Sequence, residues 1–177
     1  FGHRQAGELA TRLAEWSVTA VHASRAIRAQ QTARPVAARH ALEVEIAEGV
    51  HEVFCGDLEG RSDPEARMAF DEVYHAWGRG DLDARLPGGE SARDVRERYV
   101  PAVEALTRSA HGDVVLVSHG AAIRLGAAAL LGDTAETQYV PNTGVVVLRR
   151  DGRRWELEHW DPAPPAPGDV TAGGTAI

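Results

Sequence analysis

The segment Asp113-Val-Val-Leu-Val-Ser-His119-Gly120 decides the fold of this chain, and the Ala/Leu-rich segment 121–131 follows it directly. A short, mostly β-branched apolar run predicts a strand buried on both faces, as in a parallel sheet, and the segment after it predicts a helix. His119 is therefore expected at the carboxyl end of a strand and the amino end of a helix. Open α/β sheets bind ligands at that edge, and the N–H groups of a helix start favour an anion. Placement alone equally fits a turn histidine whose hydrogen bonds are satisfied without a ligand.

The composition is typical of a globular chain and excludes several classes of function. The 177 residues suit one domain, and 44% hydrophobic with 25% charged residues is ordinary for such a domain. The formal net charge of −7 provides no global basic field for nucleic acid or an anionic membrane. No segment has the ~18 consecutive apolar residues that a membrane span needs. The single cysteine, Cys55, allows no disulfide within the chain, which favours a reducing, cytoplasmic compartment.

Further strands and helices precede the deciding segment. Residues 18–22 predict a strand, residues 25–39 a helix and residues 44–46 a second short strand. Strand, helix and strand in this order are typical of a right-handed parallel crossover. An amphipathic stripe over residues 1–13 predicts a helix in front of them. The pattern as a whole predicts an α/β fold.

The turn after the first of these strands has the same design as the turn that holds His119. It carries Ser24 and, one helical turn later, Arg28. If the two strands are parallel neighbours, both turns lie on one edge of the sheet. A guanidinium beside an imidazole, above a helix amino end, forms an anion site of phosphate size. All 19 basic residues are Arg, so any such recognition uses guanidinium groups. Most arginines lie on solvated helix faces, and only the pairing with His119 distinguishes Arg28.

A glycine- and carboxylate-rich stretch at residues 50–60 predicts a loop over a site. It contains Glu52, a candidate proton donor, because general acids are often carboxylates held near apolar groups such as Phe54. On chemistry alone, a glutamate of this kind is more often a surface residue.

The remaining elements follow from local patterns. Ser91 begins a helix as its cap, with Asp94 three residues later, and Asp151-Gly152 predicts a hairpin turn. Residues 161–177 are rich in Pro, Gly and Ala, so the domain is expected to span 1–160 and to be followed by a disordered or loosely docked tail. No metal-ligand spacing and no dinucleotide fingerprint occurs, so neither a metal nor a cofactor is expected. The other expected elements are helices at 63–77 and 91–106, a loop at 78–89, and strands at 145–148 and 155–159.

Five motifs together, in their order along the chain, resemble the histidine phosphatase superfamily, the phosphoglycerate-mutase-like fold. The similarity covers nearly the whole chain and implies a three-layer sandwich, in which a mostly parallel central sheet has helices on both faces. The motifs are Gln5-Ala6-Gly7, Ser24-Arg-Ala-Ile-Arg28 with Gln31-Thr32-Ala33, Glu52 with Gly56 and Glu59-Gly60, Gly88-Gly89-Glu90-Ser91, and Val115-Leu-Val-Ser-His119-Gly120.

The resemblance implies three catalytic residues. Arg28 matches the family's phosphate-binding arginine, and His119 matches its second histidine, which hydrogen-bonds the phosphoryl oxygens. Glu52 matches the proposed general acid. The substrate-binding residues implied in the same way are Gly120 and Ala121, at the position whose backbone N–H faces the phosphate, together with Ser24 and Glu90.

The family's nucleophile is absent from this chain. It is a histidine in an Arg-His-Gly motif at the end of the first strand, and Gly2-His3-Arg4 aligns with the helix after that strand. Either the strand and its histidine lie upstream of Phe1 in a longer protein, or the chain is a degraded relative. The first is favoured, because the chain starts without Met and because loss of a central strand would leave unpaired backbone groups and apolar side chains.

The resemblance implies a phosphomonoester phosphatase that acts through a phosphohistidine on a small phosphorylated metabolite. A cofactor-dependent phosphoglycerate mutase is an alternative, although Ala121 and Cys55 stand where mutases usually carry Asn and Tyr. A non-catalytic module that binds a phospho-ligand or a protein is a further alternative. The expected partners are the metabolite and, as one option, a second copy of the chain in a homodimer.

Overall fold

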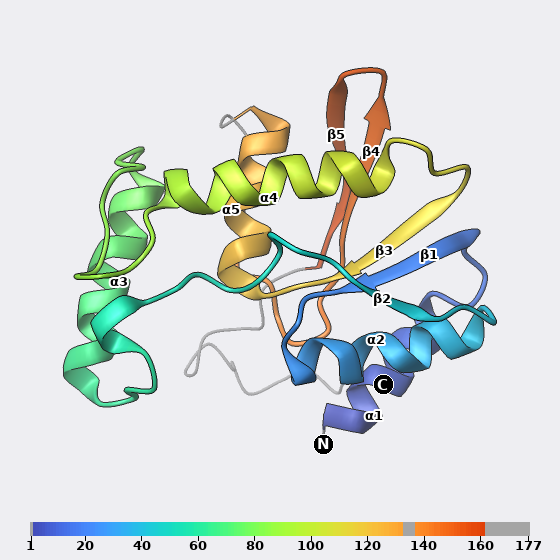
Figure 1. Ribbon diagram of the computed structural model, residues 1–177, viewed down its shortest axis with the longest axis horizontal. Coiled ribbons are helices and arrows are strands. Elements are labelled where there is room, and N and C mark those ends of the chain that lie inside the picture. Colours follow the sequence, from blue (N-terminus) through green and yellow to red (C-terminus); the bar gives the residue numbers. More distant parts are fainter. Residues whose placement is uncertain (1, 133–136, 162–177) are drawn as a thin grey trace, which may run out of the picture.

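The computed structural model describes residues 2–132 and 137–161 and shows an α/β fold (Figure 1). The elements follow the expected order, with boundaries within a few residues of those predicted. All of the predicted tail, residues 161–177, except Asp161 lies outside the described residues. No helix in the described part is long and apolar enough to cross a membrane. The elements are α1 (Gly2–Arg12), β1 (Val18–Ala23), α2 (Ile27–Arg39), β2 (Val44–Ile46), the 3₁₀ turn η1 (Gly56–Leu58), α3 (Pro64–Gly78), α4 (Ala92–Thr107), β3 (Asp113–Val117), α5 (Gly120–Leu131), β4 (Val146–Asp151) and β5 (Arg154–Trp160).

A parallel sheet in the order β2-β1-β3 forms the centre of the fold. Val21 of β1 pairs with Val44 on one side and with Val115 on the other. The register ends with Ala23 opposite Val117, so β1 and β3 finish at the same edge of the sheet. The turns that follow these two strands are therefore neighbours, which meets the condition for an anion site shared by both turns.

Helices cover both faces of this sheet, which confirms the three-layer architecture (Figure 1). On one face, α1 and α2 pack on β1 around a cluster that includes Leu9 and Val36. On the other face, α4 and α5 enclose a second cluster around Val95. Strand β3 serves both clusters by alternation, since Val117 contacts the first and Leu116 the second.

The helix that matters most for the site, α5, begins directly after His119. His119 is the N-cap residue of α5, with an extended backbone (φ −132°, ψ 153°), and Gly132 ends the helix in the left-handed region at φ 87°. At the start of α4, Ser91 and Asp94 form the predicted capping box. The predicted position of His119, after a strand and before a helix, is confirmed.

Two details of the sheet differ from the expectation. Strand β3 is half-buried along most of its length and not buried on both faces. Among the described residues its single hydrogen-bonded neighbour is β1, and β4 and β5 form a separate antiparallel hairpin. Residues of both β3 and β4 line a cavity of about 630 Å³. The outer edge of β3 therefore faces a groove, which explains its exposure.

The contact between α4 and α5 yields a stability prediction. A Cβ on Gly126 of α5 would overlap the ring of Tyr99, which is buried. Overpacking destabilises the fold by about 1–3 kcal/mol. The higher helix propensity of Ala offsets up to about 1 kcal/mol of this loss. We expect Gly126→Ala to lower the free energy of unfolding by about 1–2 kcal/mol in urea denaturation. Gly7→Ala in α1 is the control: a Cβ there meets nothing within 4 Å, so it should stabilise by about 0.5–1 kcal/mol. Equal effects of the two substitutions would show that Gly126 is not needed for close packing.

Candidate active site

The two strand-to-helix turns bring Ser24, Arg28 and His119 together. The Nε2 atom of His119 lies 2.7 Å from Ser24 Oγ, and its Nδ1 atom lies 3.0 Å from Nη2 of Arg28. Ser24 is fully buried and His119 is only 7% exposed. The pairing that distinguishes Arg28 from a solvated arginine is therefore present, between residues 91 positions apart in the chain.

These contacts define the protonation of the imidazole. A guanidinium only donates hydrogen bonds, so Nδ1 of His119 accepts from Arg28. The proton of a neutral ring then sits on Nε2, which donates to Ser24 Oγ. Burial lowers the pKa of His119 below 6.5, the charge of Arg28 lowers it further, and the carboxylate of Glu52 opposes both. The ring is uncharged at neutral pH in this arrangement, and an anion bound beside it would favour its protonation.

Glu52 reaches the same site from the loop after β2. Among the described residues, both hydrogen bonds to its carboxylate go to Oε1, from the N–H groups of Val53 (2.9 Å) and Ala122 (3.0 Å). Ala122 is in the first turn of α5, so the carboxylate lies at the positive end of that helix. This arrangement leaves Oε2 as the oxygen for a transferable proton.

The candidate site contains a cavity of about 390 Å³. Arg28, Glu52, His119 and Gly120 all line it. Gly120 and Ala121 are the first two residues of α5, where N–H groups have no acceptor within the helix and are available to an anion. Ala121 itself packs its methyl group against the core between α4 and α5, so a ligand would meet only its backbone.

The turn at residues 140–145 also borders the cavity, and the sequence did not single it out as part of the site. Asn142 and Thr143 contribute to the lining, and Thr143 has a left-handed backbone with φ 57°. Such a conformation is uncommon for a residue other than glycine and occurs often at functional sites. The available signal was the turn sequence Pro141-Asn-Thr-Gly144 after α5.

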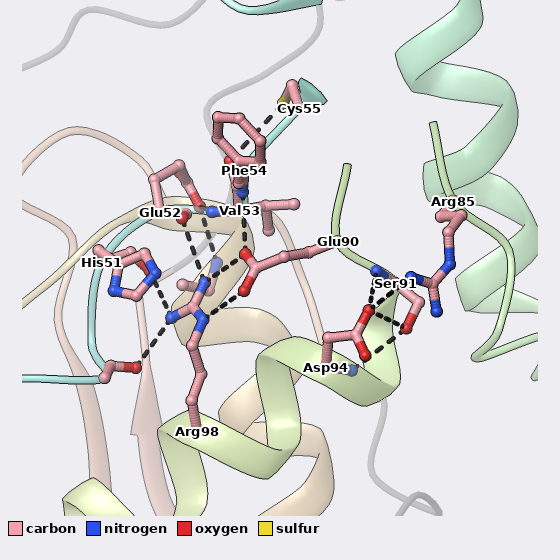
Figure 2. A network of polar contacts seen from close by, with 12 residues as sticks. His51, Glu52, Val53, Phe54, Cys55, Arg85, Glu90, Ser91, Asp94 and Arg98 are labelled. Carbon is pink, nitrogen blue, oxygen red and sulfur yellow. Dashed lines mark hydrogen bonds and ion pairs between the residues drawn. The ribbon is translucent and has the colours of Figure 1, made fainter. Parts of the chain in front are cut away.

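Glu90 does not line this cavity and lies in a separate polar network (Figure 2). Its two carboxylate oxygens accept from Nε and Nη2 of Arg98 at 2.7 and 2.8 Å, and Oε2 also accepts from the N–H of Phe54 at 2.9 Å. Burial opposes the ionisation of Glu90, but the hydrogen bonds from Arg98 and Phe54 outweigh it and hold its pKa below the usual value. Arg98 was missed at the level of sequence, where one arginine on a helix resembles any other.

The described residues contain no group of three or more His, Cys, Asp or Glu side chains placed to hold a metal ion. Cys55 is half-buried, and burial together with the nearby carboxylates of Glu59, Glu52 and Glu90 raises the pKa of its thiol. A thiol in that state is a poor nucleophile.

Comparison with known proteins agrees with this geometry. Residues 1–162 match the histidine phosphatase superfamily (branch 1). The chain is 41% identical over 105 residues to the 2,3-bisphosphoglycerate-dependent phosphoglycerate mutase of Methylobacterium radiotolerans, which covers 55% of this chain and 49% of the mutase. It is 32% identical over 139 residues to the adenosylcobalamin/alpha-ribazole phosphatase of Escherichia coli, which covers 78% of this chain and 68% of the phosphatase. The matched region thus spans about half the length of the mutase and about two thirds of the phosphatase.

A solved structure of a phosphatase has a similar fold. The complex of a mycobacterial glucosyl-3-phosphoglycerate phosphatase with inorganic phosphate superposes with a TM-score of 0.77 at 27% identity, over 91% of this chain and 85% of that one.

Proposed function

Because this chain belongs to the histidine phosphatase superfamily, we propose that it provides the phosphate-binding and acid–base residues of a phosphomonoester phosphatase that acts on a small phosphorylated metabolite through a phosphohistidine. The observation that carries this proposal is the contact of Arg28 with His119 inside one cavity that also holds Glu52. Among the relatives, the alpha-ribazole phosphatase and the glucosyl-3-phosphoglycerate phosphatase act on phosphorylated metabolites of small size.

In the proposed first step, a histidine attacks phosphorus and the P–O bond to the leaving group breaks. Arg28, His119 and the first N–H groups of α5 hold the other phosphoryl oxygens and stabilise the charge of the transition state. Glu52 donates its proton from Oε2 to the departing alkoxide. In the second step, water attacks the phosphohistidine, Glu52 takes a proton from that water, and orthophosphate leaves as the histidine is regenerated.

The nucleophile is proposed to lie upstream of Phe1, on a strand that fills the groove between β3 and β4. Three observations support this placement. The outer edge of β3 has no strand partner among the described residues. The groove is lined by both strands, and it adjoins the site cavity at Val115. A parallel strand in the groove would end at the edge where His119 lies, and it would satisfy the backbone groups that β3 leaves unpaired.

Transfer by a mutase is the second candidate, because the mutase relative is the more similar over its shorter match. Ala121 and Cys55 stand at positions where the resemblance implies Asn and Tyr for a mutase, which favours hydrolysis. Incubation of the full-length protein with 3-phosphoglycerate separates the two: release of orthophosphate supports a phosphatase, and isomerisation to 2-phosphoglycerate supports a mutase.

The decisive experiment compares the full-length protein with a protein that begins at Phe1. We expect the full-length protein to release orthophosphate from a panel of phosphorylated metabolites and to form an acid-labile, alkali-stable phosphoenzyme under rapid quench. The protein that begins at Phe1 should do neither. A full-length protein that neither turns over nor becomes phosphorylated would favour the non-catalytic binding module.

We further propose a domain spanning 1–160 followed by a short tail, and a cytoplasmic location. The single cysteine supports a reducing compartment, and the net charge of −7 argues against nucleic acid as a partner. A homodimer stays a prediction that light scattering of the full-length protein would test.

A further inference from the structure

Arg98 connects α4 to the loop that carries Glu52. Its side chain is only 16% exposed and points from the helix into that loop (Figure 2). Nη1 donates to the carbonyl oxygens of Gly49 (2.8 Å) and His51 (2.9 Å), and Nη2 donates to that of Glu52 (3.1 Å). One guanidinium therefore holds three backbone groups in a stretch of four residues.

Glu90 completes the arrangement from the opposite side. It accepts two hydrogen bonds from Arg98, and its Oε2 also accepts from the N–H of Phe54. A bidentate carboxylate–guanidinium pair at 20% and 16% side-chain exposure is both strong and geometrically specific. The loop is thereby fixed on each side of Glu52, by carbonyl groups before it and by an N–H group after it.

The backbone of the loop also lies close to α4. Gly49 has φ +79°, and a Cβ there would lie 2.7 Å from the carbonyl oxygen of Arg98. Only glycine fits this approach. The carboxylate of Glu52 meanwhile extends away from Arg98, toward Ala122 of α5 and the cavity of Arg28 and His119. The main chain of Glu52 is thus held from α4 and its side chain from α5.

We propose that Arg98 and Glu90 are positioning residues, which hold the loop 49–54 so that the carboxyl group of Glu52 reaches the leaving oxygen of the substrate. The assignment rests on the proposed function, in which Glu52 is the general acid. In this proposal Glu90 acts by holding Arg98 and the loop, and it does not contact the substrate. A misplacement of about 1 Å in a catalytic group is enough to cost roughly 10²-fold in rate.

The test uses the full-length protein and two substrates that differ in their need for an acid. An alkyl phosphate requires protonation of its leaving group, and 2,4-dinitrophenyl phosphate does not. We expect Arg98→Met to lower kcat/KM, which reports the first step alone, by about 10²-fold for the alkyl ester. The same variant should change kcat/KM for the dinitrophenyl ester by less than about threefold. Glu52→Gln should show the same selectivity, and the double variant should lose little more than either single one. Equal losses on both esters would indicate a purely structural role and would overturn the proposal.

Two further variants keep the test interpretable. Arg98→Met leaves the carboxylate of Glu90 buried and unpaired, so it can impair folding. Arg98→Lys keeps the charge but loses the planar fork, and we expect a smaller loss with the same dependence on the leaving group. Arg93→Met is the matched control, because Arg93 lies on the same helix and makes an exposed bidentate pair with Asp83. It should leave both rates near wild type.

Hydrogen exchange tests the positioning without any activity. The amides of residues 49–54, and that of Phe54 above all, should exchange faster in Arg98→Lys than in wild type and should be unchanged in Arg93→Met. Unchanged exchange in Arg98→Lys would overturn the proposal whatever the rates. A wild-type protein that hydrolyses neither ester would overturn the proposed function and the catalytic part of this inference, and the exchange result would still decide whether Arg98 holds the loop.

Discussion

Replacing His119 by alanine is expected to lower kcat/KM for phosphomonoester hydrolysis by at least about 10³-fold in the full-length protein. The imidazole lies in the cavity with Arg28 and Glu52, and both of its ring nitrogens are hydrogen-bonded in the absence of substrate. Loss of one preorganised donor to a developing oxyanion costs about 10²–10³ in kcat. Here the substitution also removes the acceptor that orients Arg28, so the two effects add. Steady-state kinetics on the best metabolite substrate measures the loss.

The control for this prediction is another partly buried histidine. His40 follows α2, and its Nε2 lies 3.0 Å from the carbonyl oxygen of Leu13; the His40 side chain does not line the cavity. His40→Ala should keep kcat/KM within about threefold, because a lost hydrogen bond of about 0.5–1.5 kcal/mol affects stability and not the site. If His119→Ala kept a rate within threefold of wild type, His119 would not be part of the catalytic site.

The sequence was sufficient for the parts of the fold that depend on local pattern. The run from Asp113 to Val117 is a strand, His119 precedes the next helix, and Ser91 with Asp94 forms a capping box. The crossover rule predicted the parallel pairing of β1 with β2. The pairing of β1 with β3 was only a condition for the shared site; the structure meets it and places Ser24 beside His119. Periodicity and capping chemistry act over a few residues, so one sequence contains all the information that they need.

Properties that depend on partners distant in the chain were less accessible. The burial of β3 was overestimated, because an apolar run predicts a strand with two neighbours and this strand has one among the described residues. An apolar sequence pattern shows that a strand has side chains suited to burial. Whether those side chains are buried depends on which other segments pack against the strand.

The candidate site divides in the same way. The contact between Arg28 and His119 was predictable, since both lie at fixed positions in two similar turns. The network of Glu90 and Arg98 was not, because Arg98 is eight residues from Glu90 and up to 49 from the loop carbonyls that it binds. Nothing in the sequence distinguishes Arg98 from Arg93, which lies on the same helix and makes an exposed ion pair. Burial creates the difference, and burial is a property of the folded chain.

Replacing Arg28 by alanine is the second substitution with a large expected effect, and it should act on both substrate binding and turnover. Two hydrogen bonds to a charged phosphoryl group are worth about 1.5–3 kcal/mol each, so kcat/KM should fall by about 10²- to 10⁴-fold, with KM raised and kcat lowered. Arg28→Lys should recover only part of this loss, because an ammonium group lacks the fork geometry. Arg25→Ala is the matched control: it lies in the same turn, its pair with Glu48 is 77% and 68% exposed, and it should change kcat/KM by less than about twofold.

Arg28→Ala also has a signature in the titration of His119 that does not depend on turnover. Burial lowers the pKa of His119 below 6.5 and the charge of Arg28 adds to that effect, so removal of the guanidinium should raise this pKa. In the wild type, the unfolded chain takes up a proton at His119 near pH 6.5 before the folded chain does, so His119 makes stability fall as the pH drops below 6.5. In Arg28→Ala the pKa of His119 in the folded chain should lie closer to its value in the unfolded chain. The free energy of unfolding should therefore fall less between pH 7.5 and 5.5 than it does in the wild type. NMR titration of the imidazole C2–H, assigned by its absence in His119→Gln, measures the pKa directly. An unchanged or lower pKa in Arg28→Ala would mean that the guanidinium does not contact the ring in solution, and the anion site built on that contact would have to be abandoned.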